Sequence, residues 1–280
     1  MPLTPVFMEK ATGDQLAPQL EQQHGGATQD AQLSGYVESV GRTLALRMSR
    51  KDIPVGFRVL ESRDIVNAFA LGNGNVYITR GLLDLLDDEA ELAEILGHEL
   101  GHVDRRHIAA SIDQALGTGL LLAAAEAVYL SRKGGTLTDR QQELVDAASA
   151  LVPQLILNGF SRSHEFEADA TGLALMSGAG YDPSAAIRVF QRFQKLEGPK
   201  KEGIEIFFRS HPWAADRVAE IRRLIEKKSL PSGRTERERY QEFVKGIRPA
   251  DADSDSGIPV PLIAGAAAVL AVGVAAIALS

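Results

Sequence analysis

Residues 92–107 read LAEILGHELGHVDRRH, and this stretch decides the fold expected of the 280-residue chain. Its apolar positions recur at helical spacing, so we expect a helix with one face toward the core. The motif H-E-x-x-H runs from His98 to His102, and about 3.6 residues per turn put both imidazoles on one face. Two imidazoles so placed can bind one Zn²⁺, with Glu99 as general base for a zinc-activated water.

Two local features support this helix. Asp88 and Glu91 form an Asp-x-x-Glu variant of the capping box at its start. Gly97 and Gly101 each cost about 1 kcal/mol relative to Ala inside a helix. Because these two glycines lie one turn apart, we expect another backbone to pass close to this face.

A catalytic zinc needs a third protein ligand and an open position, and a later stretch offers candidates. Residues 161–170 read SRSHEFEADA. We favour Glu165 as the ligand, with Glu167 and His164 as competing assignments. Asp169 follows Glu165 by one turn and is placed to accept a hydrogen bond from a ligand imidazole.

A small antiparallel sheet is predicted immediately before the metal helix. Residues 56–60 alternate like a strand, and residues 67–71 and 76–79 read as the second and third strands. Residues 72–75, Gly-Asn-Gly-Asn, are a tight-turn signal between the last two. An edge strand there could hold an extended peptide by strand addition, or the hairpin could be purely structural.

The remaining segments read mainly as helices. Residues 1–30 suggest a partly helical arm, and residues 33–48 have helical periodicity. Residues 116–130 are strongly apolar and fit a buried or membrane-apposed helix. His211 stands at the entry of a later helix, where it could reach the zinc or a developing oxyanion, or simply be a surface or capping histidine.

Composition excludes some classes of protein. The net charge is −7 and no dense basic patch is present, which argues against a nucleic-acid partner. The absence of cysteine excludes disulfides and cysteine-ligated zinc. The N-terminal residues lack the apolar core of a signal peptide.

The C-terminal residues 258–279 read IPVPLIAGAAAVLAVGVAAIAL and carry no charge. Their length suffices to cross a hydrocarbon core of about 30 Å, so we favour a membrane anchor over a buried helix or an Ala-rich tail. Lys245 and Arg248 precede the segment, and no Lys or Arg follows it. The positive-inside rule then places the main domain in the cytoplasm, although acidic residues at 251–255 lie nearer and leave an extracytoplasmic domain as the alternative.

Taken together, four motifs resemble the HtpX/CAAX-protease family of gluzincin metalloendopeptidases, in its Oma- and BepA-like small-domain branch. They are Asn-Ala-Phe-Ala at 67–70, H-E-x-x-H at 98–102, Ser-Arg-x-x-Glu-x-x-x-Asp at 161–169 and His-Pro-x-x-x-x-Arg at 211–217. The resemblance runs from about residue 32 to residue 228. At residues 71–74 the family usually continues with Pro-Gly-Gly, whereas this chain has Leu-Gly-Asn-Gly, so we expect a differently shaped loop beside the substrate strand.

The resemblance implies one zinc ion per chain, held by His98, His102 and Glu165. It also implies that Glu99 is the general base and that Asp169 supports a ligand. His211 would stabilise the transition state or, in a latent form, approach the metal. Asn67 is expected to assist His211 at the oxyanion.

We therefore predict an α+β fold: a mainly helical, zincin-like (minigluzincin) domain with a small antiparallel sheet, plus a C-terminal transmembrane helix. The predicted segments are an N-terminal arm (1–31), a zinc metallopeptidase domain (32–230), a polar linker (231–257) and a transmembrane anchor (258–280). No oligomeric state is predicted.

The predicted function is zinc-dependent hydrolysis of peptide bonds in protein or peptide substrates. The family resemblance implies a membrane-associated enzyme of protein quality control. The alternative is a latent or non-catalytic zinc-bound chaperone or assembly factor that holds polypeptide in the same groove. The intact Glu99 favours the enzyme, because binding alone does not need a general base.

Overall fold

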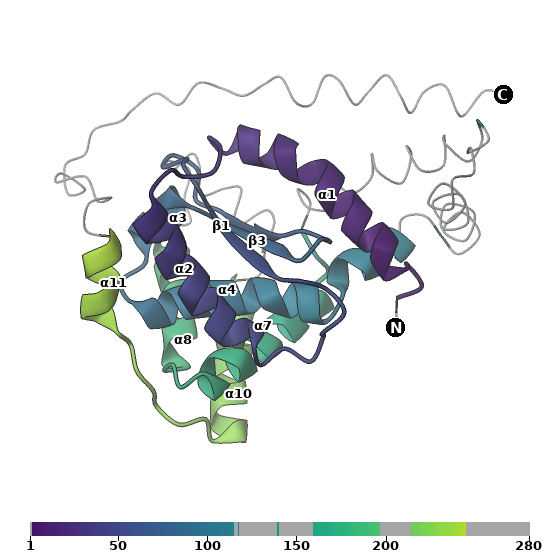
Figure 1. Cartoon of the computed structure of the whole chain (residues 1–280). Coiled ribbons are helices and arrows are strands. Elements are labelled where there is room, and N and C mark those ends of the chain that lie inside the picture. The colour runs from purple at the N-terminus through teal and green to yellow at the C-terminus, as the bar shows by residue number, and fades with distance from the viewer. Residues whose placement is uncertain (1, 115–116, 118–138, 140–158, 197–213, 245–280) are drawn as a thin grey trace. The chain divides into compact units, whose positions relative to one another are not determined.

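The computed structural model describes residues 2–114, 117, 139, 159–196 and 214–244 (Figure 1). These residues form a mainly helical α+β domain with one three-stranded sheet. The named elements are α1 (Val6–Gln23), α2 (Ala31–Ala45), β1 (Gly56–Leu60), β2 (Ala68–Ala70), β3 (Asn75–Thr79), α3 (Arg80–Leu85), α4 (Glu89–Asp104), α7 (Arg162–Gly178), α8 (Ser184–Leu196), α10 (Ala214–Lys228) and α11 (Arg237–Val244).

The sheet is mixed, and the prediction of an antiparallel sheet was wrong for one of its two strand pairs. The order is β1-β3-β2, in which β3 pairs antiparallel with β2 but parallel with β1. The predicted tight turn is confirmed, with Gly74 at φ +85° and the Leu71 N–H donating to the Asn75 carbonyl. β3 takes the centre because its side chains are buried on both faces, whereas sequence order alone suggests β2 as the neighbour of β1.

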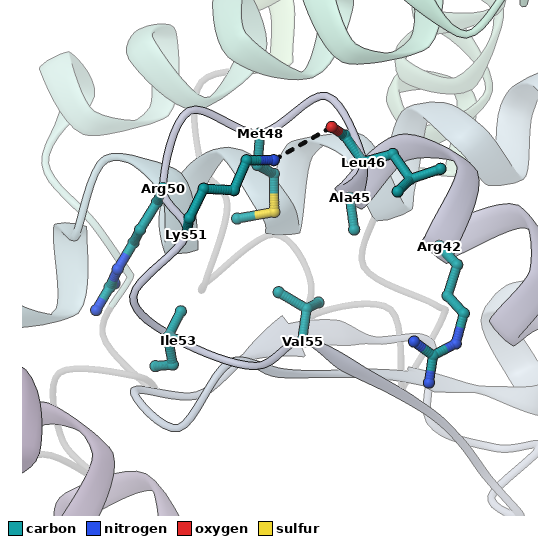
Figure 2. Close-up of a pocket in the computed structure, with 8 residues that line it drawn as sticks. All are labelled: Arg42, Ala45, Leu46, Met48, Arg50, Lys51, Ile53 and Val55. Carbon is teal, nitrogen blue, oxygen red and sulfur yellow. Dashed lines mark hydrogen bonds between the residues drawn. The ribbon is translucent and has the colours of Figure 1, made fainter.

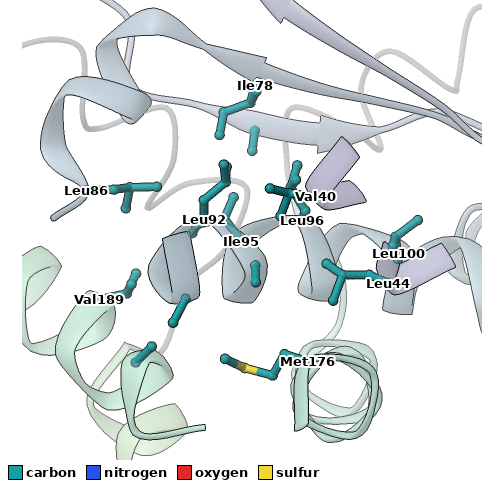
Figure 3. Close-up of a cluster of buried hydrophobic side chains, with 14 of the residues drawn as sticks. Val40, Leu44, Ile78, Leu86, Leu92, Ile95, Leu96, Leu100, Met176 and Val189 are labelled. Atoms are coloured by element: carbon teal, nitrogen blue, oxygen red, sulfur yellow. The ribbon is translucent and has the colours of Figure 1, made fainter. Parts of the chain in front are cut away.

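Two apolar layers enclose the sheet. On one face, Val76 and Ile78 of β3 belong to a core shared with α2, α4, α7 and α8. Figure 3 shows Leu92 and Leu96 of α4 between that helix and Ile78. On the other face, Tyr77 packs in a second cluster with side chains of α1. The sheet therefore lies between α1 and the α2–α4 layer (Figure 1).

The helix α4 begins where the capping signal predicts. The Asp88 carboxylate accepts a hydrogen bond from the Glu91 N–H at 3.0 Å, and the Asp87 N–H donates to the Glu91 carboxylate at 2.8 Å. These bonds satisfy one unpaired N–H of the first helical turn and the N–H of the residue before the N-cap. The cap fixes which residues of the motif face inward.

The expected close neighbour of the α4 glycines is α7. A Cβ on Gly97 would lie 3.2 Å from the Gly172 carbonyl oxygen, and one on Gly101 would lie 2.7 Å from the Ala168 carbonyl oxygen. Only glycine allows the two backbones to approach this closely. The cost of two helix-interior glycines is explained by this contact, which brings the acidic segment of α7 to the metal motif.

Residues 231–257, predicted as a polar linker, include one helix among the described residues. Helix α11 lies inside the segment predicted as a polar linker, yet Tyr240 and Val244 are fully buried. Tyr240 donates to the Leu83 carbonyl at 2.5 Å. The composition of residues 231–257 is rich in charged residues, so it does not indicate the short amphipathic helix α11. Only Tyr240 and Val244 form the buried face of that helix.

Among the helices of the described residues, none has the length and apolarity to cross a membrane. The predicted anchor at 258–280 lies outside the described residues, as does the apolar stretch at 116–130 apart from residue 117.

Candidate metal centre and active site

Helix α4 presents the two histidines of the motif on one buried face. His98 and His102 are 4% and 1% exposed. Their Nε2 atoms lie 3.1 Å apart. The helical repeat alone aligns these rings, and the apolar stripe of α4 carries them into the domain.

Helix α7 contributes the third group. Its N-cap is Ser161, whose hydroxyl accepts from the His164 N–H, and this cap puts Glu165 in the first turn. The Glu165 carboxylate oxygens lie 3.5 Å from His98 Nε2 and 3.4 Å from His102 Nε2. One ligand atom from each of the three side chains falls within 4.8 Å of the others.

These three groups fit Zn²⁺. Tetrahedral coordination at zinc-to-ligand distances of about 2.0–2.2 Å places neighbouring donor atoms about 3.3 Å apart. The observed separations of 3.1, 3.4 and 3.5 Å agree with that value. Two imidazole nitrogens and one carboxylate oxygen also leave the fourth position for water or substrate, as catalytic zinc requires.

Asp169 lies beside the imidazole of His98. The Nδ1–H of His98 donates to its carboxylate at 2.9 Å, which turns Nε2 toward the ligand cluster. Burial favours a low pKa for His98, as does the charge of Arg217, but the bonds with Asp169 and Glu165 outweigh both and raise the His98 pKa to about 10. Without metal this ring therefore carries a proton that zinc must displace from Nε2, while the bond to Asp169 keeps the Nδ1 proton in place.

Arg217 is a central residue of the site to which the sequence reasoning assigned no role. Its guanidinium is fully buried, donates to Asp169 at 2.6 and 2.8 Å, and lies 2.9 Å from the Glu165 carboxylate. These carboxylates raise its pKa despite burial. The signal for this role was a charged residue one turn before Ile221, on the apolar face of α10.

Glu94 adds a further buried carboxylate one turn before His98. It is 1% exposed, and burial together with the charge of Asp169 raises its pKa to about 7. Arg217 lowers that pKa through its positive charge. The guanidinium therefore balances more than one acidic group in this part of the core.

Glu99 is buried at 1% exposure and follows His98 directly on α4, outside the ligand cluster. Asn67 is buried immediately before β2, where its backbone exchanges hydrogen bonds with Thr79. Within the described part of the chain its Oδ1 has no hydrogen-bond partner. His211 lies outside the described residues.

The two competing ligands do not join the metal cluster. His164 and Glu167 instead lie against His107: the His164 ring stacks on it at 4.3 Å, and a Glu167 oxygen is 3.4 Å from its Nε2. The rotation of α7 about its axis explains why Glu165 joins the cluster and the other two residues do not. Glu165 shares a helix face with the small residues Ala168 and Gly172, which contact α4.

A shallow cavity of about 380 Å³ lies elsewhere, between the end of α2 and the approach to β1. Figure 2 shows Arg42 at one end, Arg50 and Lys51 at the other, and apolar side chains between. It contains none of the metal-binding candidates, so we assign it no part in the chemistry.

The fold and the site define a gluzincin-type zinc metallopeptidase, with H-E-x-x-H on one helix and a glutamate ligand on a second. The chain belongs to Peptidase family M48, whose sequence profile matches residues 31–225. It is therefore a zinc metalloendopeptidase.

Relatives are found in bacteria and a plant. The metalloprotease LoiP of Escherichia coli is 28% identical over 213 residues, 76% of this chain and 79% of that protein. The mitochondrial metalloendopeptidase OMA1 of Arabidopsis thaliana is 35% identical over 148 residues, 53% of this chain and 27% of that protein. The β-barrel assembly-enhancing protease of E. coli is 27% identical over 204 residues, 69% of this chain and 39% of that protein.

Proposed function

We propose that this metalloendopeptidase cleaves protein substrates with Glu99 as its general base, at a zinc held by His98, His102 and Glu165. The observation that carries the proposal is the meeting of those three side chains, from two helices, at separations that suit one zinc ion. Glu99 follows His98 directly on α4 and lies outside the ligand set, and we propose that its carboxylate would lie beside a zinc ion bound there.

The proposed chemistry divides between the metal and the side chains. Bound zinc supplies Lewis-acid polarisation of the scissile carbonyl and makes water acidic near neutral pH. Glu99 takes a proton from the attacking water at a carboxylate oxygen and gives it to the departing amine nitrogen. His211 and Asn67 are the proposed hydrogen-bond donors to the developing oxyanion.

The surrounding charges are proposed to hold this arrangement in place. Asp169 orients His98 through Nδ1, and Arg217 binds both Asp169 and Glu165. A ligand carboxylate tied to a buried guanidinium has little freedom to rotate away. This rigidity serves catalysis because the metal and the base must keep a fixed separation.

The first test compares the full-length wild type, purified in detergent, with Glu99→Gln on unfolded casein, with the zinc content of each measured. We expect both proteins to contain one zinc and Glu99→Gln to lose about 10²–10⁴-fold of the cleavage rate. A zinc-loaded Glu99→Gln that cuts like wild type would refute the role of Glu99. Zinc-loaded proteins that cut no substrate would favour the binding-protein alternative.

His211→Ala belongs in the same comparison. If His211 stabilises the oxyanion, its loss slows cleavage about 10²–10³-fold without loss of zinc. If only His211→Ala cuts, the enzyme is latent and His211 blocks the metal.

We further propose that residues 258–279 span a membrane and that substrates include membrane-associated or damaged proteins. The uncharged apolar length supports the span, and Lys245 and Arg248 support a cytoplasmic domain. The name of one similar protease refers to β-barrel assembly, which supports a role in protein quality control. On this proposal residues 245–257 are the tether, and α11 belongs to the enzymatic domain.

Membrane attachment is tested by expressing the full chain and a chain that ends at residue 257. The full chain should remain with membranes after extraction at alkaline pH, whereas the shorter chain should be released. Equal release of both would contradict the span and leave the peptidase assignment unaffected.

A further inference from the structure

His107 lies beneath a metal ligand because the chain turns sharply after α4. On a continuous helix, a residue five positions after His102 would face away from it. Here Arg106 adopts φ +58°, a left-handed conformation that is costly for a side chain with a Cβ. The Glu9 carboxylate binds Arg106 at 3.1 Å and the Thr4 carbonyl accepts from it at 2.5 Å, and these contacts hold the turn.

The turn brings His107 into direct contact with the second metal ligand. His107 is 2% exposed, and its Nδ1 lies 2.9 Å from Nδ1 of His102. Its Nε2 lies 3.4 Å from a carboxylate oxygen of Glu167. Phe160 stacks on the His102 ring at a centroid distance of 4.0 Å, so that ring is held both by packing and through Nδ1.

The proton positions follow from the metal site. A zinc-ligating Nε2 of His102 must offer its lone pair, so the proton of that ring sits on Nδ1. That N–H can donate to His107 only if Nδ1 of His107 is unprotonated. The proton of His107 is then on Nε2, where it points at Glu167. Each hydrogen bond in this series fixes the tautomer of one histidine, and the series ends at the Glu167 carboxylate.

We propose that His107 is the positioning residue for His102, with Glu167 setting the tautomer of His107. The two metal-binding imidazoles are then supported differently: His98 donates directly to Asp169, whereas His102 reaches its carboxylate through a second imidazole. Ligand histidines depend on such an acceptor for ring orientation and basicity. The inference rests on the zinc centre proposed above and adds a carboxylate–imidazole–imidazole relay to it.

The test measures the zinc dissociation constant of each variant by competition with a chromogenic chelator, and the melting temperature of each chelator-treated protein. We expect His107→Leu, which fills the space but accepts no hydrogen bond, to weaken zinc binding about 10–100-fold. His107→Gln offers an amide oxygen to His102 and should restore most of the affinity. The cobalt-substituted proteins should show a shifted visible spectrum for His107→Leu and a near-native one for His107→Gln.

Glu167 provides the variant least able to disturb folding, because its side chain is 49% exposed. Glu167→Ala should weaken zinc binding several-fold. The matched control is Arg105→Ala, which removes the 3.6 Å Arg105–Glu167 ion pair but leaves the relay, and should bind zinc like wild type.

Several results would overturn the relay. A folded His107→Leu that binds zinc within about threefold of wild type would do so, because loss of the hydrogen-bond acceptor of a ligand imidazole costs about 10–100-fold in affinity. Equal losses for His107→Leu and His107→Gln would indicate a packing role instead. If His107→Leu does not fold, Glu167→Ala decides: wild-type affinity refutes the relay and weakened affinity supports it. A wild type that binds no zinc would overturn the zinc centre, and the relay with it.

Discussion

At the scale of single residues, Arg217 is the charge on which the buried acids of the zinc site depend. It pairs with Glu165 and Asp169, and its guanidinium lies over the Phe190 ring at 4.2 Å. Removing one partner of a buried ion pair leaves an uncompensated charge, which costs far more than the pair contributes net. A bound Zn²⁺ ion brings two further positive charges to the same acids, so the guanidinium and the metal partly substitute for each other.

Arg217→Gln should therefore destabilise the zinc-free protein by about 3–5 kcal/mol, and zinc should restore more stability to the variant than to wild type. Urea unfolding with a chelator and with zinc measures both effects. The control is Arg223→Gln, in which an exposed pair with Glu220 is lost and little change is expected. Equal losses with and without zinc would show that the charge of Arg217 is not linked to the metal site.

His24, the C-cap residue of α1, gives a pH-dependent prediction. Burial lowers its pKa, while its Nδ1–H donates to the Leu20 carbonyl at 2.8 Å. In the unfolded chain this imidazole takes up a proton near its ordinary pKa of about 6.5, whereas in the folded chain it does so only at a lower pH. His24 therefore contributes stability above pH 6.5, and this contribution is lost as the pH falls through the lower folded pKa.

His24→Gln should remove that slope. The difference in unfolding free energy between wild type and His24→Gln is measured from pH 5 to pH 7.5, so that all shared titrations cancel. We expect the unfolding free energy of His24→Gln to rise relative to that of wild type as the pH falls below 6.5. A difference that is constant with pH would show that His24 protonates equally easily in both states.

At the scale of elements, the contact between α4 and α7 sets the geometry of the centre. Gly101 meets the backbone of Ala168, and Gly97 meets that of Gly172. Asp169 and Glu165 lie on the same face of α7, so the distance between these helices determines the distance between ligands. Helix propensity opposes glycine here, and the close approach outweighs it.

Gly101→Ala tests whether helix propensity or the close approach of α4 and α7 dominates stability at this position. Propensity alone would stabilise the helix by about 1 kcal/mol, but the new methyl group would lie 2.7 Å from the Ala168 carbonyl oxygen and force the helices apart. We expect a net loss of about 1–3 kcal/mol together with weaker zinc binding. Thermal melting and zinc titration provide the two readouts.

The matched control is Gly35→Ala in α2. Its Cβ would meet nothing within 4 Å, so the substitution should stabilise the protein by about 0.5–1 kcal/mol. If Gly101→Ala behaved like Gly35→Ala, the close approach of α4 and α7 would not control the site.

At the scale of the whole domain, α4 is fixed at both ends by distant parts of the chain. Near its start, the Glu89 carboxylate accepts from Tyr36, Tyr181 and Arg239, which come from three separate segments. Near its end, the Val103 carbonyl accepts from Arg50 at 3.0 Å, and both carboxylate oxygens of Glu9 in α1 bind Arg50 in turn. The metal helix thus holds its position because α1, α2 and α11 all bind it or its neighbours.

Helix α1 should therefore be essential to the fold, although the family profile begins at residue 31. Leu16 is 6% exposed in the cluster beneath the sheet, whereas Leu3 is 58% exposed. Leu16→Ala should cost about 2–5 kcal/mol, and Leu3→Ala should cost little. Deletion of residues 1–30 should give an aggregated chain by gel filtration. A deleted chain that melts like wild type would show that α1 is dispensable.

The sequence by itself determined what depends on neighbours a few residues apart. The cap at Asp88 and the spacing of His98 and His102 define the metal helix, and the turn at residues 72–75 defines the hairpin. These features are local because hydrogen bonds within one turn fix them. The metal, the reaction class and the likeness to known peptidases follow from the same short motifs.

Only the tertiary structure decided which distant groups meet. The contact between α7 and α4 brings the favoured Glu165 to the two histidines and leaves Glu167 beside His107, and the left-handed turn at Arg106 brings His107 back to His102. Arg217 is buried in the core because its guanidinium pairs with the buried carboxylates of Glu165 and Asp169 on α7. These outcomes depend on how close two backbones can approach and on where buried charges find partners, and no short stretch of sequence encodes either.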